Sequence, residues 1–126
     1  MIITFEIPVA PRTKKNHQQI INKRVGGKTI HKVIPSKQYR EYEAKCEPYI
    51  PRLGIDYPVN VKALYYTDTR RRVDLINLHE ALHDILVKYG CLTDDNSRII
   101  VSTDGSRVLY DKDNPRTVVW IEEVEE

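Results

Sequence analysis

Residues 74–90 read DLINLHEALHDILVKYG, and this stretch decides the fold. Its apolar residues recur every three or four positions, the spacing of one buried helix face: Leu75, Leu78, Leu82, Ile85, Leu86 and Tyr89. Asp74 suits the positive N-terminal end of such a helix, and Gly90 suits a stop at its C-terminal end. We therefore expect a helix over residues 74–89 that packs by one face against the rest of the domain.

Strand and turn patterns flank this helix. β-Branched and aromatic residues predict strands over residues 2–7, 59–67, 98–102 and 117–121, with the last two joined by a turn as an antiparallel pair. Residues 19–33 predict a hairpin that turns at Gly26–Gly27, and Ser36 is a fitting N-cap for a helix that runs to about residue 50. This order predicts an α/β (α+β) fold, a small mixed β-sheet covered by two main helices, in a single domain over residues 1–126.

The composition excludes several classes of protein. Of the 126 residues, 40% are hydrophobic and 30% charged, and no stretch approaches the roughly 18 apolar residues of a membrane helix. The sequence opens without a basic leader or a cleavage site, and Cys46 and Cys91 form neither a disulfide framework nor a metal-spaced pair. We expect a cytoplasmic protein with no membrane partner, in which both cysteines are reduced and packed.

The net charge of +2 hides a segregation of charge. Residues 12–40 hold nine Lys or Arg and no Asp or Glu, whereas the chain from residue 57 onward holds nine basic and thirteen acidic residues. A basic span of this density suits a polyanion, and the separate cluster of Arg70, Arg71 and Arg72 favours nucleic acid. The alternative interpretation is an ordinary solvated basic face.

One motif in the helix suggests zinc. His79, Glu80 and His83 form an H-E-x-x-H sequence, which on a helix can bind zinc with the glutamate as general base. The helical spacing, however, puts both histidines on the flank of the apolar stripe, and no third ligand follows at a short spacing. Half-buried or dimer-contact histidines are the favoured interpretation, and a zinc hydrolase is the most distant alternative.

A second motif sets carboxylates beside arginines. The three arginines precede Asp74, and Asp94 and Asp95 follow the helix. Carboxylates hold Mg²⁺, which in nucleases orients water and neutralises phosphate charge. Asp74 and Asp95 lie at opposite ends of a predicted helix about 24 Å long, so they share a metal only if the chain folds back after Gly90 or a dimer completes the site. The alternative is a capping aspartate and an ordinary Asp-Asp turn.

These residues resemble the RusA family of Holliday-junction resolvases, small phage and prophage endonucleases. The family pattern has basic residues, then D-L-D-N-L-x-K-A-x-x-D-A-L, a glycine and a D-D pair, and residues 70–95 follow this spacing without a gap. Pro8, Pro11 and Asn16 also fit the family's N-terminal loop. The resemblance implies an α/β homodimer that uses Mg²⁺ (or Mn²⁺) to make paired nicks across four-way DNA junctions, in recombination and repair. The two-fold symmetry of a junction is a physical reason for two related active sites.

Two departures from the family pattern concern the active site. Ile76 stands where the family has its second aspartate, and Glu80 stands where it has a lysine. Because residues i and i+4 are neighbours on a helix, the Glu80 carboxylate is a hypothetical replacement for the missing one. The resemblance implies Asp74 and Asp95 as catalytic residues and metal ligands; on the replacement hypothesis Glu80 joins them in both roles, with Asp94 as a further ligand. The alternative is a weak or inactive resolvase that only binds branched DNA.

The basic residues are expected to hold DNA. Arg70, Arg71 and Arg72 would hold phosphates next to the scissile bond. Residues of the N-terminal basic span would follow the DNA arms, with an affinity that falls steeply as salt rises: Lys14, Lys15, Asn16, Lys23, Arg24, Lys28 and Lys32.

Overall fold

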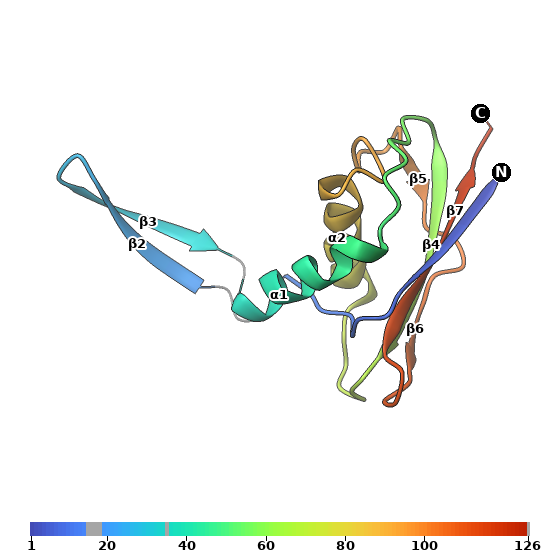
Figure 1. Ribbon diagram of the computed structural model, residues 1–126, viewed down its shortest axis with the longest axis horizontal. Coiled ribbons are helices and arrows are strands. Elements are labelled where there is room, and N and C mark those ends of the chain that lie inside the picture. Colours follow the sequence, from blue (N-terminus) through green and yellow to red (C-terminus); the bar gives the residue numbers. More distant parts are fainter. Residues whose placement is uncertain (15–18, 35, 126) are drawn as a thin grey trace.

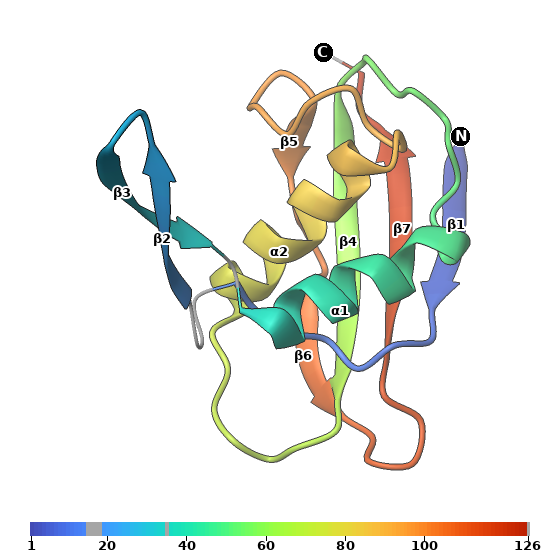
Figure 2. The same cartoon turned by 60° about the vertical axis from the view of Figure 1, so that its left-hand side comes forward.

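A computed structural model gives the structure of the protein (Figures 1 and 2). It describes residues 1–14, 19–34 and 36–125, and within residues 19–25 and 30–34 it describes the backbone alone. The elements in chain order are β1 (Ile2–Ile7), β2 (Gln19–Val25), β3 (Lys28–Ile34), α1 (Lys37–Cys46), the 3₁₀ turn η1 (Glu47–Tyr49), β4 (Val59–Thr67), α2 (Leu75–Lys88), β5 (Ile100–Ser102), β6 (Arg107–Tyr110) and β7 (Arg116–Glu123).

The main sheet is mixed, as predicted. Its path is β1-β7-β4-β5, and β6 also pairs with β4. β7 runs antiparallel to both β1 and β4, whereas β5 and β6 run parallel to β4. Both helices lie on the same face of this sheet (Figures 1 and 2). The predicted architecture of a small mixed sheet with two covering helices is therefore confirmed.

Three details differ from the sequence prediction. The strands β5 and β7 do not pair with each other but lie on either side of β4, and β6 was not predicted because its four residues are too few to show a pattern. β5 begins at Ile100 instead of residue 98, since the N–H groups of Ile99 and Ile100 both donate to Asn96 in a turn. α1 ends at Cys46, because Pro48 has no N–H to continue the helix and η1 takes over.

The core lies between the helices and the sheet. β4 alternates strictly between buried and half-buried residues, and its buried side chains pack against the apolar faces of α1 and α2. The largest fully buried side chains include Tyr39, Tyr65, Leu82 and Ile85. Cys46 and Cys91 are buried and free, as expected. Burial raises the pKa of these thiols to about 12 and about 11, so both stay protonated at neutral pH.

The strands β2 and β3 form a separate hairpin. They pair antiparallel in register from Gln19↔Ile34 to Val25↔Lys28. The turn at Gly26 and Gly27 has positive φ angles of 58° and 82°, which glycine adopts without strain. Figure 1 shows this predicted hairpin extending away from the helices and the main sheet. In the described ranges, no helix has the length and apolar character needed to cross a membrane.

Candidate functional site

Asp74 caps the N-terminus of α2. Its backbone is extended (φ −83°, ψ 121°), and its Oδ1 accepts a hydrogen bond from the N–H of Ile76 at 2.9 Å. A carboxylate at this position satisfies a free N–H group and meets the positive end of the helix dipole. The predicted capping role is therefore confirmed, and the exposed carboxylate remains accessible from solvent.

The chain reverses direction after α2. Gly90 has a φ of +83°, and the N–H groups of Cys91 and Leu92 both donate to the Leu86 carbonyl, at 2.9 and 3.2 Å. Ile55 then exchanges two hydrogen bonds with this segment, donating to Cys91 and accepting from Thr93, both at 3.0 Å. The turn and these bonds bring the following residues back towards α2.

After this reversal, Asp95 lies within electrostatic range of Asp84, a residue in the second half of α2. Desolvation, the side chain of Asp94 and the negative charge of Asp84 together raise the pKa of Asp95. A like charge disfavours the ionised form because two carboxylates repel each other at short range. The charge of Asp84 is thus one of the causes that disfavour the ionised form of Asp95.

Lys14 supplies a cation next to Asp84. Its ammonium group forms an ion pair with Asp84, in which the two side chains are 30% and 33% exposed. The same ammonium lies 5.9 Å from the centre of the Tyr39 ring on α1. We call Lys14, Asp84 and Asp95 the acidic cluster; it joins the N-terminal basic span, the helix α2 and the reversed chain after it.

Asp74 lies away from the acidic cluster. Ten residues of helix separate it from Asp84, which corresponds to about 15 Å along the axis. Among the residues that the structure describes, no three His, Cys, Asp or Glu side chains are grouped closely enough to hold a metal ion. Within one chain, then, the structure does not bring together the predicted ligands Asp74, Glu80 and Asp95.

Asp94 stabilises the turn that carries Asp95. Its Oδ1 accepts from the backbone N–H of Asp95 at 2.7 Å, and its Oδ2 accepts from the Asn96 side chain at 3.1 Å. The hydrogen bond from the Asp95 backbone, followed by that from Asn96, lowers the pKa of Asp94. Both oxygens of this predicted metal ligand are thus already used to hold the turn.

Ile76 and Glu80 both lie on the exposed side of α2. The Ile76 side chain is 72% exposed, which is unusual for a large apolar residue. Glu80 follows four residues later and is also exposed. Their shared face is compatible with the hypothesis that Glu80 replaces the carboxylate missing at position 76.

The two histidines of the H-E-x-x-H sequence lie inside the domain. The rings of His79 and His83 stack at 5.4 Å with an angle of 8°, and Nδ1 of His79 is hydrogen-bonded to the Tyr65 hydroxyl at 2.7 Å. Burial lowers the pKa of His79, and burial beside His79 lowers that of His83 to about 4. Packed, neutral rings fit the predicted half-buried role of these histidines, and among the described residues no third ligand is grouped with them.

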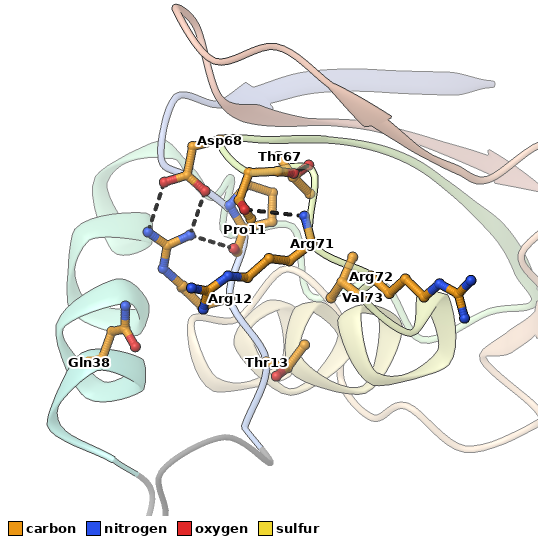
Figure 3. Close-up of a pocket in the computed structure, with 10 residues that line it drawn as sticks. Pro11, Arg12, Thr13, Gln38, Thr67, Asp68, Arg71, Arg72 and Val73 are labelled. Carbon is orange, nitrogen blue, oxygen red and sulfur yellow. Dashed lines mark hydrogen bonds and ion pairs between the residues drawn. The ribbon is translucent and has the colours of Figure 1, made fainter.

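The three consecutive arginines have different surroundings. Arg70 stacks on the Tyr110 ring, with its guanidinium carbon 4.1 Å from the ring centre. Arg71 and Arg72 instead line a pocket of about 430 Å³ that also includes Arg12 and Asp68 (Figure 3). Arg12 donates two hydrogen bonds of 3.0 Å to Asp68, and this pairing lowers the pKa of the Asp68 carboxyl.

The structure describes the remaining DNA-binding candidates only in part. Lys28 is exposed at the start of β3. Lys23 and Arg24 lie on β2 and Lys32 on β3, where the backbone alone is described. Lys15 and Asn16 lie outside the described residues.

Two residues of this region were missed by the sequence analysis. Asp84 coincides with the aspartate of K-A-x-x-D in the family pattern, and that match was the signal available for it. Arg12 opens the basic span, but no local pattern indicates its long-range partner Asp68.

No protein-family model matches the chain, and no curated protein matches it.

Proposed function

We propose that the protein is a Mg²⁺-dependent, structure-specific DNA endonuclease that resolves four-way junctions and related branched DNA as a homodimer. The observation that carries this proposal is the acidic cluster, in which Lys14 is ion-paired with Asp84 and Asp95 lies within electrostatic range of Asp84. Carboxylates that hold a metal, next to cations that hold phosphates, are the arrangement required to hydrolyse a phosphodiester. The resemblance of residues 70–95 to RusA resolvases supports the same conclusion.

The acidic cluster offers two carboxylates to a magnesium ion. Mg²⁺ is commonly bound through one or two protein carboxylates, with water and substrate phosphates completing the shell. Asp84 and Asp95 would hold the ion, and their mutual repulsion would be relieved by it. When bound, Mg²⁺ would supply a more acidic water and a positive charge at the phosphate.

The protein's own cations then have distinct tasks. Lys14 forms an ion pair with Asp84 and lies within the basic span that would meet the DNA. Arg71 and Arg72 would hold phosphates beside the start of α2, and the basic hairpin β2–β3 would reach along a DNA arm (Figure 1).

Asp74 and Glu80 remain proposed catalytic carboxylates. A two-fold dimer offers a way to complete the site, because Asp74 of one copy can then meet the acidic cluster of the other. Paired nicks on opposite strands also require two active sites, and a chain of this size provides one.

A non-catalytic junction-binding protein is the second candidate function. It is favoured by Ile76 in place of the family aspartate and by the use of both Asp94 oxygens in hydrogen bonds. Such a protein would hold branched DNA through its cations without cutting it.

One assay separates these functions. The protein is incubated with a synthetic four-way junction and with a linear duplex of the same sequence, in Mg²⁺, Mn²⁺, Zn²⁺ alone or EDTA. Paired nicks restricted to the junction and abolished by EDTA support the nuclease, and Asp95→Asn should remove them while Asp113→Asn, in an exposed loop, should not. A shifted band without nicks supports the binding protein. Cleavage that requires Zn²⁺ contradicts both.

A further inference from the structure

The pocket beside the three arginines is formed by three separate segments. Pro11, Arg12 and Thr13 come from the loop after β1, and Gln38 comes from α1. Thr67 ends β4, and residues 68–69 and 71–73 come from the connection between β4 and α2. Figure 3 shows the Arg71 side chain extending towards Arg12, whereas Arg72 extends in the opposite direction along α2. The pocket therefore lies at the N-terminal end of α2, and its Thr13 directly precedes Lys14 of the acidic cluster.

The charges of the pocket favour an anion. Asp68 is already bound by both terminal nitrogens of Arg12, and Arg12 also donates to the Pro11 carbonyl at 3.0 Å. These bonds fix the Arg12 guanidinium in place. Arg71 makes no ion pair with any residue in the described part of the chain, so its charge is available to a ligand. Guanidinium groups bind phosphate through paired hydrogen bonds.

The size of the pocket calls for more than a phosphate. A volume of about 430 Å³ lies in the range of sites that enclose small organic molecules, about 300–1,000 Å³. Pro11 and Val73 supply apolar wall, and guanidinium planes are surfaces on which nucleobases stack. The Gln38 carboxamide carries both donors and an acceptor for the edge of a base.

We propose that this pocket takes one unpaired nucleotide from a branched DNA strand, with its phosphate on Arg71 and its base between the Arg12–Asp68 pair and Gln38. The inference rests on the proposed function for its substrate, and it adds a recognition step that phosphate contacts alone do not provide. A nucleotide at a branch point is already poorly stacked, so moving it into a pocket costs less than in a continuous duplex. The protein would thereby distinguish a branch from a linear duplex, and would hold the strand within reach of the acidic cluster.

Two measurements test the pocket. First, deoxyadenosine 5′-phosphate, deoxyadenosine and inorganic phosphate are titrated into the isotope-labelled protein, and amide shifts are followed by NMR. The nucleotide should bind more tightly than either fragment, with shifts centred on the pocket residues. Second, 2-aminopurine is placed at the branch point of a four-way junction, where its fluorescence rises when the base leaves the stack.

Matched variants give the expected contrast. Arg71→Ala should weaken nucleotide binding about tenfold or more, as loss of a charge-assisted hydrogen bond predicts, and Gln38→Ala should reduce the preference for the nucleotide over inorganic phosphate. Arg107→Ala removes an equal charge from exposed β6 and should preserve both the nucleotide affinity and the fluorescence rise. Thermal melting of each variant checks that the fold is intact.

The outcomes separate this inference from the proposed function. Junction nicking with no fluorescence rise and no nucleotide shifts overturns the pocket but leaves the nuclease. Nucleotide binding that depends on Arg71, in a protein that neither binds nor cuts junctions, supports the pocket and overturns the nuclease. Equal binding of phosphate and nucleotide, or equal loss in the Arg71 and Arg107 variants, refutes a nucleotide site.

Discussion

Replacing Gly90 with alanine should damage the site by disturbing the turn that returns Asp95 to α2. Gly90 has a φ of +83°, and a Cβ built there would meet only the Arg52 side chain at 4.0 Å, an ordinary contact. The cost is therefore backbone strain of about 1–2 kcal/mol, offset in part by the roughly 0.4–1 kcal/mol gained from a stiffer unfolded chain. We expect a net loss of about 1 kcal/mol in the free energy of unfolding, or about 4 °C in Tm for a domain of this size.

The assay combines urea unfolding with junction nicking at 25 °C. Gly90→Asn is the graded variant, because asparagine tolerates a positive φ better than alanine and should recover part of the lost stability. Val119→Ala is the matched control, since it removes fully buried volume from β7, a strand that carries none of the proposed site residues. Gly90→Ala should reduce nicking more than Val119→Ala does, although both remain folded. The reasoning would be refuted if Gly90→Ala and Gly90→Asn were equally stable. It would also be refuted if nicking by all the variants fell only in proportion to their loss of stability.

Three further predictions concern single side chains. Glu80→Gln should reduce Mg²⁺-dependent nicking as strongly as Asp74→Asn does. If Glu80→Gln cuts undiminished while Asp74→Asn is inactive, Glu80 does not replace the missing carboxylate. The pKa of His83 is lowered in the folded state to about 4, so the unfolded chain takes up a proton at a higher pH than the folded protein does. The free energy of unfolding should therefore fall as the pH falls from about 6.5 towards 4, by at most roughly 3 kcal/mol. Urea unfolding of His83→Gln across this range should show a weaker dependence on pH, and an unchanged dependence would assign the effect to other groups. Lys14→Ala removes a partly exposed ion pair and should change the free energy of unfolding by no more than about 1 kcal/mol. It should also lower the Mg²⁺ concentration needed for half-maximal nicking, because the ammonium no longer competes with Mg²⁺ for Asp84. A higher Mg²⁺ requirement would contradict that competition.

Most of the fold follows from local patterns in the sequence. The apolar stripe of α2, the capping residues Ser36 and Asp74 and the Gly26–Gly27 turn all act within a few residues, and the structure confirms each of them. The pairing of β5 and β6 with β4 could not be predicted in the same way. It depends on contacts between residues about 40 positions apart, such as those between Asn60 and Ser102, which no local periodicity encodes.

The candidate site likewise depends partly on local sequence and partly on contacts between residues far apart in the chain. The sequence places Asp95 after a helix, but the course of the chain back along that helix depends on the turn at Gly90 and on hydrogen bonds between Ile55 and residues 91–93. Asp84 and Arg12 were missed because their significance lies in partners, Lys14 and Asp68, that are 70 and 56 residues away. Local residue types therefore indicate which side chains could take part in a site, whereas the side chains that meet depend on contacts between distant parts of the sequence.

The cap at Asp74 ties the stability of α2 to whatever else this carboxylate does. One of its oxygens holds the N–H of Ile76, so a rotation of the side chain towards a metal or a second copy of the chain would free that N–H. Losing an N-cap typically costs about 1 kcal/mol, which the new ligand would have to offset. Assembly of the site would then compete with capping of α2, and amide hydrogen exchange at the start of the helix should rise as the site assembles.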